Sequence, residues 1–130
     1  MADHLELGRQ GEDAAARLLT GKGLTVLERN YRCRLGEVDL ICRHGRTLVF
    51  VEVKTRGQGS LAAGTDAVDR RKRSRIVKAA AEYLSANGLW DQPCRFDVVS
   101  VLLAGGRLAC EHVADAFVVD EGGGRGWQPW

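Results

Sequence analysis

The sequence lacks the features of a protein that enters or crosses a membrane. No hydrophobic run approaches the roughly 18 residues that a transmembrane helix needs. The first 13 residues include acids and contain no apolar core of a signal peptide. We therefore expect no membrane partner and a cytoplasmic location. The length of 130 residues predicts one domain over residues 1–120, and the glycine-rich end predicts a flexible tail over residues 121–130.

Cysteine is sparse and shows no metal-binding spacing. The chain has four cysteines, none of them in a CxxC pair: Cys33, Cys42, Cys94 and Cys110. This spacing argues against a structural zinc site. We expect the four thiols to be reduced and to belong to small, partly buried residues. A metal site that combines them with His44 and His112 is the less favoured alternative.

Basic residues are concentrated in one stretch of the chain. Residues 70–78 contain no acid and six basic side chains, namely Arg70, Arg71, Lys72, Arg73, Arg75 and Lys78. The last twenty residues are mildly acidic by comparison. Such a polarised distribution is typical of a protein that contacts nucleic acid on one side. The residues expected to bind phosphate are Arg70, Arg71, Arg73, Arg75 and Lys78. The alternative is an ordinary solvated helix face.

The spacing of apolar residues predicts two helices. In residues 4–21 one stripe recurs at three- and four-residue steps and comprises Leu5, Gly8, Glu12, Ala15, Ala16 and Leu19. A second helix is predicted from residue 65 or 66 to about residue 86, before the stop signal Asn87-Gly88. Its stripe comprises Val68, Lys72, Ile76, Ala79, Ala80, Tyr83 and Leu84.

Short β-rich runs predict five strands. They cover residues 24–32, 38–43, 47–55, 95–103 and 107–113. The second and third runs flank His44-Gly45 and predict a hairpin. Residues 56–64 read as a glycine-rich loop. The predicted order is therefore α-β-β-β-α-β-β.

Charged residues share one face of the predicted hairpin. Glu52 and Lys54 are two residues apart and project together, beside Phe50. If the turn has two residues, Asp39 pairs with Phe50 and lies diagonal to Glu52, at a Cβ separation of roughly 7–8 Å. A three-residue turn would move Asp39 to the opposite face. Burying charge is costly unless it is paired or bound to a metal. The alternatives are a structural Glu52–Lys54 ion pair on an edge strand and a simple solvent-facing alternation.

The same residues suit chemistry at a divalent cation. Carboxylate oxygens are ligands that Mg²⁺ or Mn²⁺ prefers, and a bound ion would activate water and offset charge on a phosphate. Asp39 and Glu52 would hold the ion, and Lys54 would orient the attacking water. Glu12 lies on the stripe of the first helix and is a further candidate ligand, since Gly8 would let that helix approach the sheet. Lys72 has a similarly anomalous place in the second stripe. Both side chains could instead reach solvent from a stripe edge.

These residues resemble a known family. Gly8-Gln10-Gly11-Glu12, Tyr31-Arg32, the run from Gly36 to Ile41 and the run from Phe50 to Arg56 are similar to the YraN-like family of uncharacterised bacterial proteins. That family resembles the archaeal Holliday-junction resolvases and the restriction-endonuclease-like (tRNA-endonuclease-like) superfamily. The likeness covers about residues 5–118. The proline that names the superfamily motif is absent, because Val38 precedes Asp39.

The resemblance implies a fold and an activity. The fold is α/β (α+β), with a restriction-endonuclease-like core of order α-β-β-β-α-β and a mixed central sheet flanked by helices. The activity is that of a Mg²⁺- or Mn²⁺-dependent endonuclease that hydrolyses phosphodiester bonds in nucleic acid, with branched DNA as the expected substrate. The alternative is a non-catalytic module of the same fold that binds nucleic acid or a protein. Since one site cuts one strand, paired cuts would need a homodimer, for which Trp127 and Trp130 are candidate contacts.

The positions that match the family's motif imply a set of site residues. The catalytic set implied by the resemblance is Glu12, Asp39, Glu52 and Lys54, with Asp39, Glu52 and Glu12 as metal ligands. Glu37, Arg56 and Lys72 form a second rank. Asp97 has no assigned catalytic role, and we expect it to be structural.

Overall fold

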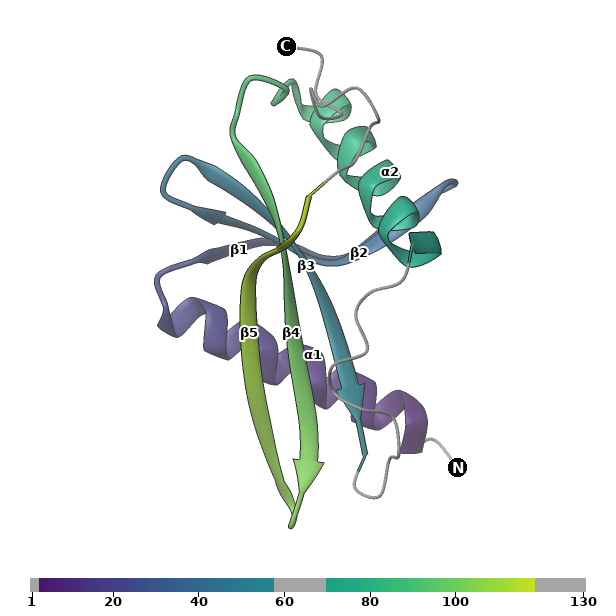
Figure 1. The fold of residues 1–130 in the computed structure, drawn as a ribbon, viewed down its shortest axis with the longest axis vertical. Coiled ribbons are helices and arrows are strands. Elements are labelled where there is room, and N and C mark those ends of the chain that lie inside the picture. Colours follow the sequence, from purple (N-terminus) through teal and green to yellow (C-terminus); the bar gives the residue numbers. More distant parts are fainter. Residues whose placement is uncertain (1–2, 58–69, 119–130) are drawn as a thin grey trace.

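A computed structural model of the chain describes residues 3–57 and 70–118. They form two helices and five strands (Figure 1). In chain order these are α1 (Asp3–Gly21), β1 (Thr25–Cys33), β2 (Gly36–His44), β3 (Thr47–Arg56), α2 (Arg70–Asn87), β4 (Cys94–Ala104) and β5 (Arg107–Phe117). Each corresponds to a predicted element. The predicted start of the second helix, most of the glycine-rich loop and the tail lie outside the described residues. In the described part of the chain, neither helix combines the length and apolar character needed to span a membrane.

The strands form one mixed sheet. Their order is β1-β2-β3-β4-β5, with β3 and β4 parallel and the other neighbours antiparallel. A parallel pair needs a crossover, and α2 lies in the chain between its two strands. β3 has a partner on either side. The alternative that placed Glu52 and Lys54 on an edge strand is therefore wrong.

The two helices pack against different sets of sheet residues. Leu48 and Phe50 belong to the apolar cluster that α2 completes. Val49 and Val51 belong to the cluster that contains Leu19 and two alanines of α1. This confirms the predicted alternation along β3. Glu52 continues the Leu48–Phe50 series, so it belongs to the α2 face of the sheet.

The hairpin between β2 and β3 turns one residue later than predicted. His44 pairs with Thr47, so the turn is Gly45-Arg46. Gly45 has a φ of 63°, a left-handed conformation that glycine adopts at the first position of such a turn. Phe50 therefore pairs with Ile41 and not with Asp39. The shift amounts to two residues in the pairing, which preserves the face of Asp39 and brings it directly opposite Glu52 rather than diagonal to it.

The close approach of α1 to the sheet occurs at Gly11, not at Gly8. A Cβ at Gly11 would overlap the side chain of Thr55 on β3, whereas a Cβ at Gly8 would meet nothing within 4 Å. The buried line of α1 accordingly runs through Gly11, Ala15 and Leu19. Glu12 lies at the edge of this line and not on it, with its side chain 21% exposed.

Helix α2 buries the stripe that the sequence predicted. Its buried residues are Ile76, Ala79, Ala80, Tyr83 and Leu84. The helix ends at Asn87, and Gly88 takes a φ of 65°. This confirms the predicted Asn87-Gly88 stop. Val68, the first predicted member of the stripe, lies outside the described residues.

Candidate functional site

Two carboxylates meet where β2 and β3 pair. Glu52 is only 5% exposed. Asp39 is half-buried, and its Oδ2 accepts a hydrogen bond from the main-chain N–H of Val53 at 2.8 Å. Burial, followed by the charge of Glu52, raises the pKa of Asp39 from 3.8 to about 7, and a hydrogen bond between the two side chains contributes in the same direction. Near neutral pH the carboxyl of Asp39 is therefore partly protonated.

Lys72 of α2 is the positive partner of this pair. Its Nζ lies 2.9 Å from Oε2 of Glu52. Burial lowers the pKa of Lys72, but the hydrogen bond to Glu52 and the charges of Glu52 and Asp39 outweigh it, so that the pKa is raised above 10.5. Lys72 therefore stays charged. Its anomalous position in the helix stripe is explained by this contact, which directs its ammonium group to Glu52.

The remaining predicted residues of the hairpin lie next to the acid pair, farther from the β2–β3 turn. Lys54 follows Glu52 on the same face and is half-buried, beside Ser100 of β4 in the sheet register. Arg56 is half-buried at the end of β3. Glu37 lies two residues before Asp39, with its Oε1 3.7 Å from Nε of Arg32, and its charge contributes to the raised pKa of Lys72.

Glu12 reaches β1 rather than the acid pair. Its Oε1 accepts a hydrogen bond from Nδ2 of Asn30 at 3.0 Å. Asn30 lies between the two β1 residues that pair with Leu40 and Val38, so it stands opposite Asp39. Glu12 is thus tied to the strand that neighbours Asp39. Over residues 3–57 and 70–118, no three carboxylate, histidine or cysteine side chains are close enough to hold a metal together. The structure brings together two of the three predicted ligands.

Asn30 is a residue that the sequence reasoning missed. It adopts a φ of 55°, a left-handed conformation in which asparagine is enriched. Its side chain is directed to Glu12. The available signal was the asparagine itself, since asparagine is disfavoured inside strands. Gly11 was visible in the family-like motif, but its contact with Thr55 joins two distant segments and leaves no local trace.

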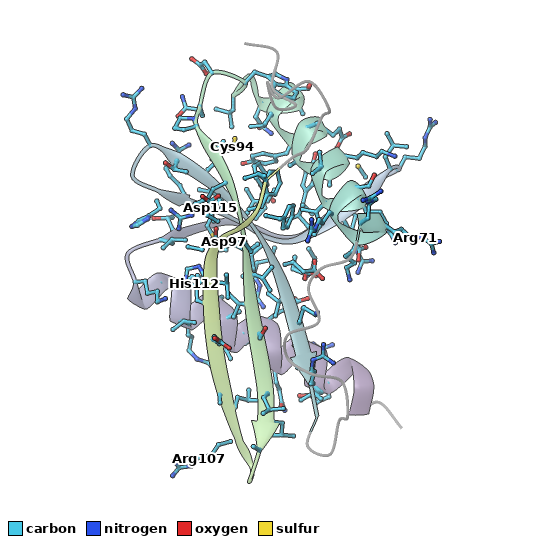
Figure 2. All side chains as sticks on the ribbon, viewed as in Figure 1. Arg71, Cys94, Asp97, Arg107, His112 and Asp115 are labelled. Atoms are coloured by element: carbon cyan, nitrogen blue, oxygen red, sulfur yellow. The ribbon has the colours of Figure 1, made fainter. Side chains whose placement is uncertain are left out.

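The predicted phosphate-binding residues divide into two groups. Arg70, Arg71, Arg75 and Lys78 are exposed on α2, and Figure 2 shows Arg71 projecting from one end of that helix. Arg73 is half-buried instead, with its guanidinium 5.3 Å from the centroid of the Phe117 ring. Part of its role is thus a cation–π contact that joins α2 to β5. Because Lys72 belongs to the same helix, the basic surface adjoins the Asp39–Glu52 pair.

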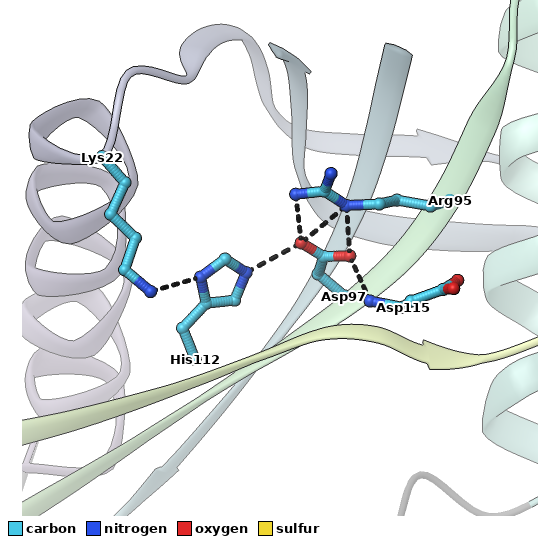
Figure 3. A network of polar contacts seen from close by, with 5 residues as sticks. All are labelled: Lys22, Arg95, Asp97, His112 and Asp115. Atoms are coloured by element: carbon cyan, nitrogen blue, oxygen red, sulfur yellow. Dashed lines mark hydrogen bonds and ion pairs between the residues drawn. The ribbon is translucent and has the colours of Figure 1, made fainter.

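A second polar cluster lies around Asp97 of β4 (Figure 3). Asp97 is fully buried and is paired with Arg95, whose Nε lies 3.0 Å from Oδ1. Nε2 of His112 lies 2.7 Å from Oδ2, and the main-chain N–H of Asp115 donates to Oδ1 at 2.9 Å. Nδ1 of His112 is in turn 2.9 Å from Nζ of Lys22, just beyond α1. These contacts tie three segments together and account for Asp97 as a structural residue.

The four cysteines are free thiols, as predicted. Cys42 is buried and the other three are partly buried. Burial, with a contribution from the charge of Asp97, raises the pKa of Cys42 to about 12. A thiol with so high a pKa is protonated and unreactive at neutral pH.

Comparison with known proteins identifies relatives along almost the whole chain. The sequence model of the uncharacterised protein family UPF0102 matches residues 11–101. A UPF0102 protein of Nitratidesulfovibrio vulgaris (strain DP4) is 46% identical over 126 residues, which cover 95% of this chain and 94% of that protein. A UPF0102 protein of Lawsonia intracellularis is 39% identical over 96% of this chain and 97% of its own length. One from Moorella thermoacetica is 49% identical over 74% of this chain and 80% of its own.

Proposed function

The chain belongs to the uncharacterised protein family UPF0102, and from this premise we propose that it is a metal-dependent endonuclease that hydrolyses phosphodiester bonds in nucleic acid, with branched DNA as its substrate. The proposal includes a restriction-endonuclease-like core, for which the five-stranded mixed sheet between two helices is the supporting observation.

The observation that carries the proposal is the Asp39–Glu52 pair. Two carboxylates that face each other in a half-buried place repel, and this repulsion, together with burial, raises the pKa of Asp39 to about 7. A divalent cation would remove this repulsion more completely than a proton, and oxygen-only ligands suit Mg²⁺ or Mn²⁺. When bound, the ion would lower the pKa of a water molecule and offset charge on the scissile phosphate. The residues present therefore fit such an ion.

The other predicted residues of the site would position the reacting groups and neutralise their charges. Lys54, on the face of Glu52, would orient the attacking water and offer a positive charge to the phosphate. The ammonium of Lys72 lies 2.9 Å from Oε2 of Glu52 and balances its charge when no ion is bound. Glu12 holds Asn30 opposite Asp39 and would accept a hydrogen bond from water on the ion. Arg56 and Glu37 lie on the side of the pair away from the β2–β3 turn and would contact the substrate there.

Helix α2 would bind the nucleic-acid backbone. Its exposed arginines Arg70, Arg71 and Arg75 offer bidentate donors to phosphate. Since Lys72 of this helix touches Glu52, a strand bound along α2 passes beside the acid pair. The neighbouring location of a basic surface and an acidic pair favours cleavage over binding alone.

The test is cleavage of a panel of labelled substrates. Forked, flapped, four-way and linear DNA, together with RNA, are incubated with Mg²⁺ or Mn²⁺, and products are resolved on denaturing gels. We expect cleavage that Asp39→Asn or Glu52→Gln reduces by at least about 100-fold. Asp91→Asn, which changes an exposed acid outside the site, is the matched control and should cleave normally.

Two results would contradict the proposal. Equal cleavage by wild type, Asp39→Asn and Glu52→Gln would identify a contaminating nuclease. Tight, metal-independent binding with no cleavage of any substrate would favour the non-catalytic binding module of the same fold.

A further inference from the structure

The hairpin of β1 and β2 forms an arm that lies against α2 (Figure 1). The rings of Tyr31 and Tyr83 meet edge to face at 5.3 Å, and the hydroxyl of Tyr31 donates to Glu82 at 2.6 Å. Gly36 packs so closely on the main-chain carbonyl of Arg75 that no Cβ would fit. These contacts fix the arm to the helix along its length.

The tip of the arm is a two-residue turn, Arg34-Leu35, which we call the arm turn. It is closed by the pairing of Cys33 with Gly36. The apolar residues on either side of it, Cys33 and Val38, pack into the α2 cluster. Leu35 is 58% exposed. The fold therefore anchors the arm but leaves most of the Leu35 side chain at its tip exposed.

Positive charge surrounds this leucine. Arg34 is exposed, and the side chain of Arg32 is 73% exposed. On α2, Arg71, Arg75 and Lys78 recur at three- and four-residue steps and so share one exposed face. The next residue of that series is Glu82, which bonds Tyr31 of the arm, so this face of α2 lies on the side of the arm. One acid lies close to these arginines: Oε1 of Glu37 is 3.7 Å from Nε of Arg32.

An exposed leucine on a rigid arm, with arginines nearby, suits the binding of distorted duplex DNA. Proteins that distort duplex DNA bind its phosphates with basic side chains and insert an apolar wedge between base steps. Leu35 has the apolar character and the rigid support, and the arginines have the complementary charge. Leu35 and Asp39 are four positions apart, which is about 13 Å of extended chain.

We propose that the arm turn is a wedge that unstacks bases at the branch point of duplex DNA, while the arginines of the arm and of α2 bind the flanking phosphates. This inference deepens the proposed function by assigning the feature that selects a branched substrate. It also predicts that cleavage falls within a few base pairs of the branch, because the wedge is about 13 Å from Asp39.

The test measures unstacking without catalysis. A forked DNA carries 2-aminopurine at the branch, and its fluorescence is recorded with added protein in EDTA. Wild type should raise the fluorescence about threefold or more, because an unstacked base is no longer quenched. Leu35→Ser should abolish this rise and lower the affinity for forked over linear DNA about tenfold. Leu102→Ser is the matched control, since Leu102 is 44% exposed on β4 and lies outside the arm. Both variants should keep the wild-type melting temperature.

The outcomes separate this inference from the nuclease proposal. Unstacking without cleavage supports the wedge and contradicts the nuclease. Cleavage with a fluorescence rise that Leu35→Ser leaves intact overturns the wedge alone. A wild-type dimer that Leu35→Ser converts to a monomer in sedimentation would assign the leucine to self-association and overturn the wedge. Absence of any binding to DNA overturns it as well.

Discussion

Asp97 and the Asp39–Glu52 pair are carboxylates of one sheet, buried or half-buried, with different surroundings. In the register, Asp97 stands beside Val51, which packs with α1, whereas Glu52 stands on the α2 face. Asp97 is surrounded by a guanidinium, an imidazole and a main-chain N–H (Figure 3). Asp39 and Glu52 face each other, the ammonium of Lys72 contacts Glu52, and a main-chain N–H bonds Asp39.

This difference separates a structural acid from a site with cation-binding capacity. The carboxylate of Asp97 is saturated by donors that the fold itself supplies, so it has no need of a ligand. The pair instead brings two like charges together, which with burial raises the pKa of Asp39 to about 7. A low exposed fraction alone does not distinguish the two sites. The charges around each carboxylate do.

The comparison is tested most strongly by removing one charge from each site. Asp97→Asn leaves the guanidinium of Arg95 and the hydrogen bond of His112 without their partner. It should lower the free energy of unfolding by about 3–5 kcal/mol. Asp39→Asn removes a repelling charge and keeps an acceptor for the N–H of Val53, so stability at pH 7.5 should stay equal or rise by about 1 kcal/mol. Urea denaturation in EDTA measures both.

The comparison depends on Asp97→Asn lowering the stability while Asp39→Asn leaves it equal or raises it. Equal destabilisation by Asp97→Asn and Asp39→Asn would show that both acids are structural. It would remove the physical reason for placing a cation between Asp39 and Glu52.

The pH dependence of stability tests the same difference between the two sites. The folded-state pKa of Asp39, about 7, lies above its ordinary value of 3.8. Between these values the folded protein binds more protons than the unfolded chain, so the Asp39 contribution to stability falls as pH rises and levels off above pH 7. The slope is at most about 1.4 kcal/mol per pH unit. The measurement is the difference between wild type and Asp39→Asn in EDTA from pH 4 to pH 8, because subtraction cancels the other titrating groups.

Mn²⁺ provides the control for this series. A cation that binds the ionised pair stabilises the folded state by mass action, and more so at pH 8 than at pH 5. We therefore expect added Mn²⁺ to flatten the wild-type profile and to leave Asp39→Asn nearly unchanged. A difference profile that rises with pH would contradict the raised pKa of Asp39.

Much of the fold was predictable because its signals are local. Alternation along β3 fixed which of its residues face each helix, and the Asn87-Gly88 stop fixed the end of α2. The parity of the β2–β3 turn was right, and so Asp39 was assigned to the correct face. Its register was wrong by two residues, because the preference of Gly45 for a positive φ decides where the turn begins.

The contacts of the site were less predictable because they join distant segments. Helical periodicity does not distinguish Gly8 from Gly11 as the point of approach, since the answer depends on Thr55 across the interface. Lys54 was the candidate partner for Glu52 in sequence, and the ion pair that Lys72 makes with Glu52 from α2 was not predicted. The donors around Asp97 come from β4 and β5, and Lys22 after α1 contacts one of them, His112. No local pattern brings these segments together.

The last prediction concerns substitution of the basic residue that pairs with the buried acid in each site, Lys72 beside Glu52 and Arg95 beside Asp97. The side chain of Lys72 is 48% exposed, and that of Arg95 is 24% exposed beside a fully buried acid. Solvent screens the Lys72 pair, so Lys72→Met should cost about 0.5–1 kcal/mol of stability. Arg95→Met should cost about 1.5–3 kcal/mol, because it removes a hydrogen-bonded partner from a buried charge. Calorimetric titration gives the second readout: Mn²⁺ should bind Lys72→Met more tightly than wild type, since the competing ammonium is gone, and bind Arg95→Met as it binds wild type. Weaker binding to Lys72→Met would mean that this lysine organises the pair rather than occupying a cation's place.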